Sequence, residues 1–153
     1  MCDEAYSSAV DPRRSRISVA EVALAVGGFG IGTGEFAIMG LLPQVADDVG
    51  VSVPRAGAVI SAYALGVVVG APLIAVLAAR FSRFRVLLVL MLLFAIGNFA
   101  SAIAPDFYTL VAARFFAGLP HGAYFGVAAL VAAGLAAPNQ RARVVVIVML
   151  GLT

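Results

Sequence analysis

Arg114, His121 and Glu35 are ionisable side chains inside stretches of sequence that are otherwise apolar. Arg114 and His121 belong to ARFFAGLPHGAYFGVAAL, and Glu35 belongs to GFGIGTGEFAIMGLLP. An ionised side chain at the centre of a bilayer costs about 2.5 to 3.5 kcal/mol on insertion scales, so such residues usually face a bundle interior or a watery cavity. We interpret Arg114 as functional; the alternative is that it reaches the headgroups or bonds backbone carbonyls. For His121 a functional role and a packing role fit equally.

Glu35 and Arg114 are candidates for an ion pair. Their two stretches are expected to cross a membrane in opposite directions, because basic residues cluster in alternate loops. With a helical rise of about 1.5 Å per residue, both side chains should lie about 10 Å below the outer surface. Separating such a pair would turn Glu35 into a proton acceptor, because a nearby cation favours the ionised carboxylate. The pattern therefore predicts a proton-coupling or cavity site made of Glu35, Arg114 and His121.

Glycines share the helical face of these ionisable residues. Steps of three and four residues place Arg114, Gly118 and His121 on one face of a helix. Glycines spaced as GxxxG let two helix backbones approach closely in a membrane. The positions predicted to pack helices are Gly66, Gly70, Gly118, Gly122 and Gly126.

Several other kinds of site find no support in the sequence. It holds no GxSG serine motif, no HExxH zinc motif and no cysteine cluster, so we expect neither an enzyme nor a cofactor or metal site. The segment GGFGIG is embedded in an apolar stretch with no strand before it, which argues against a phosphate loop. The 10 basic residues are all arginines spread along the chain, so nucleic acid is not an expected partner.

The elements that must position these residues are membrane-spanning helices. Of the 153 residues 63% are hydrophobic and only 12% are charged, and the mean hydropathy is +1.07. About twenty apolar residues cross the hydrocarbon core as a helix. The fold class expected is an all-α, polytopic transmembrane bundle with the lipid bilayer around it. The chain divides into a tail at 1–16 and a bundle at 17–153, with spans at about 17–42, 56–79, 84–104, 107–136 and an incomplete fifth at 142–153.

Charged residues in the loops predict the orientation. Arginines precede the first span, join the second to the third and precede the fifth, whereas the intervening loops carry mainly Asp47, Asp48 and Asp106. Because basic residues favour the cytoplasmic side, the N-terminus is expected in the cytoplasm. The fifth span supplies little more than half the residues needed to cross, so the sequence is expected to be cut within a helix.

Three stretches resemble the N-terminal part of a major facilitator superfamily transporter. They are GTGEFAIMGLLPQVADDVGVS, SAYALGVVVGAPLIAVLAARFSRFRVLL and ARFFAGLPHGAYFG. Within that superfamily the chain most resembles the bacterial drug and sugar efflux branch, the arabinose efflux permease-like drug:proton antiporters. The resemblance implies twelve spans in two halves around a central cavity, lined by the first and fourth spans of each half.

The resemblance also implies roles for single residues. Arg114 and Gly118 match the family pattern R-x-x-x-G, in which the arginine is implicated in proton coupling, and Glu35 matches an acidic position of related efflux proteins. The family loop signature G-x-L-A-D-R-x-G-R-[KR] retains Arg80 and Arg83 here. Its aspartate, which helps to latch the cytoplasmic side, is replaced by Ala79.

Two functions are consistent with these observations. The first is a fragment of a secondary active transporter that exports a drug, sugar or metabolite by proton antiport with alternating access. Its partners would be the substrate, protons and the missing C-terminal spans, in a bacterial cytoplasmic (inner) membrane. The alternative is a non-transporting membrane remnant or helix-assembly partner, which a true stop after Thr153 would favour over a continuing reading frame.

Overall fold

Six helices make up the computed structural model, which describes residues 19–136 and 139–150. The four that are long and apolar enough to cross a membrane are α1 (Val19–Gly40), α3 (Val53–Ala78), α4 (Arg83–Ala102) and α5 (Phe107–Leu135). The two shorter ones are α2 (Leu42–Asp48) and α6 (Arg141–Leu150). Over the described residues these helices confirm the predicted all-α bundle with four full spans.

The helix α2 was not expected, because its residues belong to a segment interpreted as a loop. Pro43 occupies the first turn, where a missing N–H costs no hydrogen bond, and Ala46 is buried. Gly50 then has a φ of 66°, a left-handed conformation that glycine adopts easily and that ends the helix. The predicted tail at 1–16 and the last residues of the fifth predicted span lie outside the described residues.

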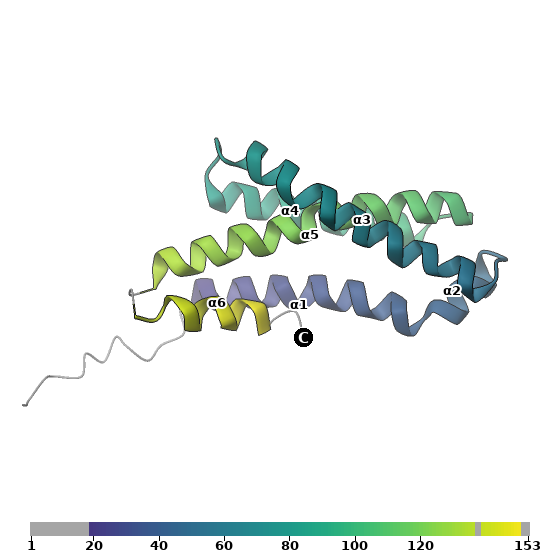
Figure 1. Cartoon of the computed structure of the whole chain (residues 1–153), viewed down its shortest axis with the longest axis horizontal. Coiled ribbons are helices and arrows are strands. Elements are labelled where there is room, and N and C mark those ends of the chain that lie inside the picture. The colour runs from purple at the N-terminus through teal and green to yellow at the C-terminus, as the bar shows by residue number, and fades with distance from the viewer. Residues whose placement is uncertain (1–18, 137–138, 151–153) are drawn as a thin grey trace, which may run out of the picture.

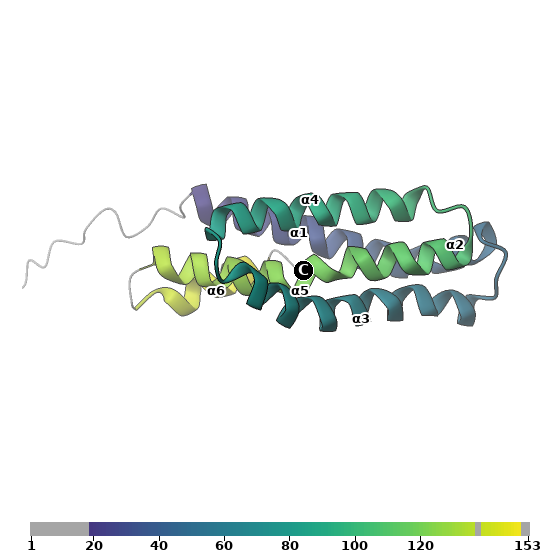
Figure 2. The ribbon, with the colours of Figure 1, turned by 90° about the horizontal axis from the view of Figure 1, so that it is seen from above.

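The helix α5 is the centre of the bundle. In the most apolar stretch of α5, 50% of the residues are buried. The corresponding share is 22% in α1 and α3 and 28% in α4. Seen from above, α5 lies between α3 and α4 (Figure 2). The side view shows α6 beside the first half of α1 (Figure 1). About half of the residues in this stretch of α5 are therefore enclosed by other helices, and these include polar residues.

Asp106 caps the start of α5. Its Oδ1 accepts hydrogen bonds from the backbone N–H groups of Tyr108, at 2.9 Å, and Thr109, at 3.0 Å. Its Oδ2 accepts from the Thr109 hydroxyl at 2.7 Å. The bond from the Thr109 backbone, followed by the bond from its hydroxyl, holds the pKa of Asp106 below its ordinary value. The cap fixes where the central helix begins.

Replacing Asp106 by alanine is expected to lower the thermal unfolding temperature of the purified protein at neutral pH, since two backbone N–H groups lose their acceptor. Because the pKa of Asp106 is lower in the folded than in the unfolded state, its stabilising effect is present at neutral pH and is lost as the pH falls through the folded-state value. The difference between variant and wild type should therefore shrink in acid. Asp48→Ala, at the exposed end of α2, is the matched control; an equal effect there would contradict the capping role.

Candidate functional site

Two polar side chains of α5 lie in the interior of the bundle. Arg114 is 2% exposed and His121 is 8% exposed. They are two helical turns apart, so both project from the same face. An arginine and a histidine at buried positions of the central helix need polar partners from the neighbouring helices.

Arg114 finds its partners on α3 and α4. Its Nη1 donates a hydrogen bond to Oδ1 of Asn98 at 3.2 Å, and its Cζ lies 4.3 Å from the ring centroid of Tyr63. The Nε atom is buried and has no hydrogen-bond partner in the described part of the chain. Arg114 is thus a buried cation held by one amide and one aromatic face, with donor capacity left for an anion.

His121 lies between a tyrosine and a carboxylate. Its Nδ1 is 2.9 Å from the hydroxyl oxygen of Tyr63 and 3.7 Å from Oε2 of Glu35. The ring of Phe125 packs against the imidazole at 5.3 Å between centroids. The Glu35 side chain is 33% exposed, so it is the most open part of the arrangement.

These contacts define a polar cluster that joins four helices. It consists of Glu35 on α1, Tyr63 on α3, Asn98 on α4, and Arg114 and His121 on α5. A carboxylate and an imidazole can exchange a proton, and a permanent cation beside them changes which of the two holds it. The cluster therefore has the groups needed to bind a proton and to pass the change in charge to several helices.

The structure brings the three predicted residues into one cluster but does not pair Glu35 with Arg114. Within the described residues, the carboxylate of Glu35 instead lies 3.7 Å from Nδ1 of His121, a contact that becomes an ion pair when the imidazole is protonated. The guanidinium of Arg114 turns toward α3 and α4, where Tyr63 and Asn98 lie. Glu35 of α1 instead approaches α5 at His121. The expected direct pair is thus replaced by a longer connection through Tyr63 and His121.

Sequence reasoning missed Tyr63 and Asn98. The signal for Asn98 is that it is the one amide side chain within the apolar run of α4, where it also donates to the Phe94 carbonyl at 2.9 Å. Tyr63 carries a weaker signal: it lies three residues before Gly66, on the same helical face as that packing glycine. Neither type of residue is unusual enough in a span to be selected without the contacts.

The glycines of α3 and α5 explain how Tyr63 comes so close to Arg114. A Cβ on Gly66 would meet the carbonyl oxygen of Phe115, and one on Gly118 would meet that of Tyr63. Gly70 similarly faces Leu119, and Gly122 faces Ala71 and Val67. These four glycines lie where the backbones of α3 and α5 approach. Gly126, expected to pack in the same way, is exposed and has nothing within 4 Å of an added Cβ, so it does not belong to this contact.

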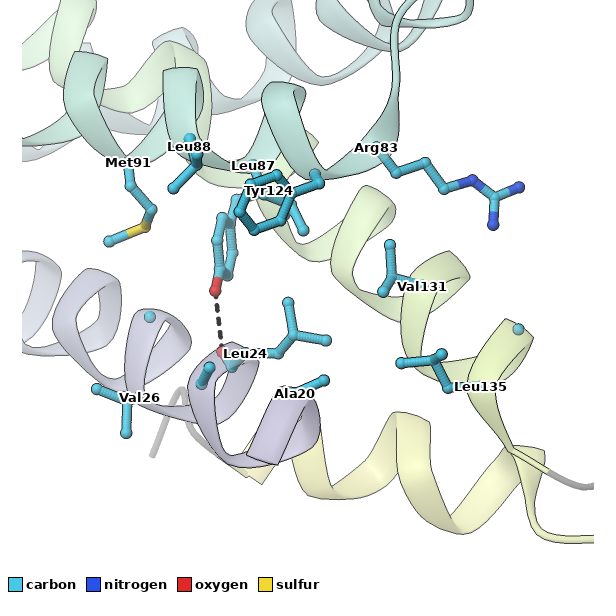
Figure 3. Close-up of a pocket in the computed structure, with 14 residues that line it drawn as sticks. Ala20, Leu24, Val26, Arg83, Leu87, Leu88, Met91, Tyr124, Val131 and Leu135 are labelled. Atoms are coloured by element: carbon cyan, nitrogen blue, oxygen red, sulfur yellow. Dashed lines mark hydrogen bonds between the residues drawn. The ribbon is translucent and has the colours of Figure 1, made fainter. Parts of the chain in front are cut away.

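The two arginines of the expected loop motif lie at the junction of α3 and α4. Arg80 is exposed in the turn, and Arg83 begins α4 and donates from Nη1 to the Leu130 carbonyl of α5 at 3.2 Å. Arg83 also borders an apolar cavity of about 680 Å³ between α1, α4 and α5 (Figure 3). There the Tyr124 hydroxyl donates to the Leu24 carbonyl at 3.0 Å. No residue of the polar cluster lines this cavity, so it is separate from the candidate site.

Comparisons with known proteins agree with this architecture. The profile of the family described as Major Facilitator Superfamily matches residues 24–153. The chain is 49% identical over 138 residues to the inner membrane transport protein YdhP of Escherichia coli (strain K12), covering 90% of this chain and 36% of that protein. It is 44% identical over 132 residues to the putative transporter AraJ of the same organism, covering 86% and 34%.

A third relative carries a more specific name. The chain is 39% identical over 130 residues to a chloramphenicol resistance protein of Streptomyces lividans, covering 85% of this chain and 33% of that protein. The chain spans about a third of the length of these curated relatives.

Proposed function

The chain belongs to the major facilitator superfamily, and we propose that it forms the N-terminal part of a transporter that exports a small molecule in exchange for protons. The polar cluster is the observation that carries this proposal. It holds a carboxylate and an imidazole 3.7 Å apart inside helices long enough to cross a membrane. Ionisable groups in such a place typically belong to ion or proton pathways.

Proton binding would change the charge of the cluster. With His121 neutral, the cluster carries one negative charge on Glu35 and one positive charge on Arg114. A proton bound at His121 or Glu35 adds a positive charge, and an uncompensated charge away from water is unfavourable. The loaded and unloaded clusters therefore favour different placements of α1 and α3 around α5. In the proposed cycle, protons from outside stabilise one placement and the exported substrate stabilises the other.

The arrangement in the membrane follows from charge. We place the N-terminus in the cytoplasm of a bacterium and the helices in its inner membrane. Arg80 lies in the turn between α3 and α4, and Arg83 and Arg85 lie in the first turn of α4. Two more arginines open α6, on the same side of the bundle. Asp106 starts α5 at the opposite side. The full-length protein would add the C-terminal spans, in keeping with the greater length of the relatives.

The proposed substrates are small drugs, sugars or metabolites. The relative named as a chloramphenicol resistance protein supports a drug as one class. The relatives named as transport proteins fit any of the three classes.

The test uses the full-length protein in bacterial cells that lack their own exporters. A panel of antibiotics and sugars is loaded, and their efflux is followed before and after a protonophore dissipates the proton gradient. We expect at least one compound to be exported by cells with the protein, and its export to stop when the gradient is dissipated. Export that continues without the gradient would contradict proton coupling. No export of any compound by correctly inserted protein would contradict transport.

Glu35→Gln in the full-length protein is expected to lower the rate of gradient-driven export by at least about tenfold. A factor of ten corresponds to a free-energy difference of about 1.4 kcal/mol. Glutamine keeps the shape of the side chain but cannot bind and release a proton near neutral pH. Asp48→Asn, an exposed carboxylate at the end of α2, is the control and should export normally. Normal gradient-driven export by Glu35→Gln would contradict the proposal that the polar cluster couples protons to export.

A further inference from the structure

We propose that Tyr63 is a positioning residue of the cluster: its hydroxyl occupies Nδ1 of His121 in competition with the carboxylate of Glu35, while its ring holds the guanidinium of Arg114. The inference rests on the proposed function and goes beyond it, because it identifies the residue that connects the proton-binding pair to the cation. It follows from two contacts of the Tyr63 side chain, from the approach of Glu35 to the same nitrogen, and from the helix packing that fixes Tyr63.

The competition arises because two groups approach one nitrogen. The Tyr63 hydroxyl oxygen lies 2.9 Å from Nδ1 of His121, within hydrogen-bond range, and Oε2 of Glu35 lies 3.7 Å from the same atom, outside it. Nδ1 can accept a hydrogen bond from the Tyr63 hydroxyl only while it carries no proton itself. It can donate a hydrogen bond to Glu35 only after it has gained a proton. The 2.9 Å contact suits a hydrogen bond in either direction, according to the tautomer of His121. In our proposal Tyr63 is the donor, which leaves the ring proton of His121 on Nε2.

A proton that arrives at Nδ1 reverses these roles. The Tyr63 hydroxyl can then no longer donate to that nitrogen, and the new N–H is attracted to the carboxylate of Glu35. Tyr63 and Glu35 are thus alternative hydrogen-bond partners of Nδ1. Tyr63 is the partner when Nδ1 carries no proton, and Glu35 is the partner when it carries one.

The other side of Tyr63 connects this exchange of partners to Arg114. The guanidinium lies over the tyrosine ring, 4.3 Å from its centroid, and a cation removed from water is attracted to the electron-rich face of an aromatic ring. One side chain on α3 therefore contacts two residues that are two turns apart on α5. A change at His121 that moves Tyr63 also changes the environment of the buried cation.

Helix packing keeps Tyr63 in this place. The carbonyl oxygen of Tyr63 lies against Gly118, and Gly66 on the next turn of α3 lies against the Phe115 carbonyl. Tyr63 itself is 2% exposed. The side chain thus has little freedom unless α3 moves relative to α5, so release of the Tyr63 contacts and movement of α3 should occur together.

The experiment reads the position of the ring proton directly. Full-length protein with isotope-labelled histidine is studied by nitrogen NMR at a pH where histidine is neutral, about 9, and the His121 signal is assigned by its loss in His121→Gln. In the wild type we expect Nδ1 without a proton. In Tyr63→Phe, which keeps the ring but removes the hydroxyl, the form with a proton on Nδ1 should increase at least about fivefold relative to the other.

The matched control is Tyr108→Phe, an exposed tyrosine whose hydroxyl contacts Arg55 instead, and it should leave the His121 signal unchanged. A wild-type spectrum with the proton on Nδ1 would overturn the inference without any variant, so it stays testable even if Tyr63→Phe fails to fold. An unchanged ratio in folded Tyr63→Phe would overturn it as well. The expected spectra together with normal gradient-driven export by Glu35→Gln would instead overturn the proposed function and leave the role of Tyr63 in the cluster supported.

Discussion

Arg114→Ala is expected to reduce export by the full-length protein about tenfold to a hundredfold. The change removes a charged hydrogen bond to Asn98 and a cation that lies on the Tyr63 ring. A hydrogen bond to a charged group contributes about 1.5 to 3 kcal/mol, and each loss of about 1.4 kcal/mol corresponds to a factor of ten. It also leaves the Glu35 carboxylate without the cation that balances its charge in the cluster. The measurement is the initial rate of export, corrected for the amount of protein in the membrane.

Two further variants separate charge from position. Arg114→Lys keeps the positive charge but loses the planar guanidinium that lies on Tyr63 and reaches Asn98, so partial export is expected. Arg143→Ala removes an exposed arginine at the start of α6 and should export at the wild-type rate. Equal export rates for Arg114→Ala and Arg143→Ala would show that the buried cation has no part in transport.

Gly118→Ala is expected to cause the largest loss of stability among single methyl additions to α5. The new Cβ would meet the carbonyl oxygen of Tyr63, which is backbone and cannot turn away. Extra volume in a closely packed contact costs about 1 to 3 kcal/mol. The helices α3 and α5 must then separate, so Tyr63 should also lose its contacts with Arg114 and His121. Unfolding of the purified protein by heat or detergent, measured beside export, would record both effects.

Gly126→Ala is the matched control for this prediction. Gly126 lies on the same helix, but nothing comes within 4 Å of an added Cβ there. Alanine also has a higher helix propensity than glycine, so this variant should be as stable as the wild type or slightly more so. If both variants lost stability equally, close packing of α3 against α5 would not be the cause.

The fold could be predicted largely because a membrane imposes strong rules on sequence. A span must be long and apolar, and all its backbone groups must be bonded within the helix, so the stretches that became α1, α3, α4 and α5 were visible from hydropathy alone. The short helix α2 was not, because its proline and aspartates are also typical of turns. Its helical hydrogen bonds and the burial of Ala46 are evident only from the structure.

The candidate site was predictable in part, for a similar physical reason. Glu35, Arg114 and His121 are conspicuous because ionisable groups are costly in hydrocarbon. Their partners are not conspicuous: Tyr63 and Asn98 are tolerated in spans for many reasons, and which charges meet depends on how α1, α3 and α4 are arranged around α5. The expected pair of Glu35 with Arg114 came from depth alone, and depth does not determine the direction in which a side chain turns.

The central claim is that the cluster couples proton movement to export. The most direct measurement compares two modes of transport by full-length Glu35→Gln in lipid vesicles, using a compound that the wild type exports. The account predicts that an imposed pH gradient no longer drives net transport, while exchange of labelled for unlabelled compound, which needs no net proton movement, continues. Gradient-driven transport at the wild-type rate in this variant would contradict the account.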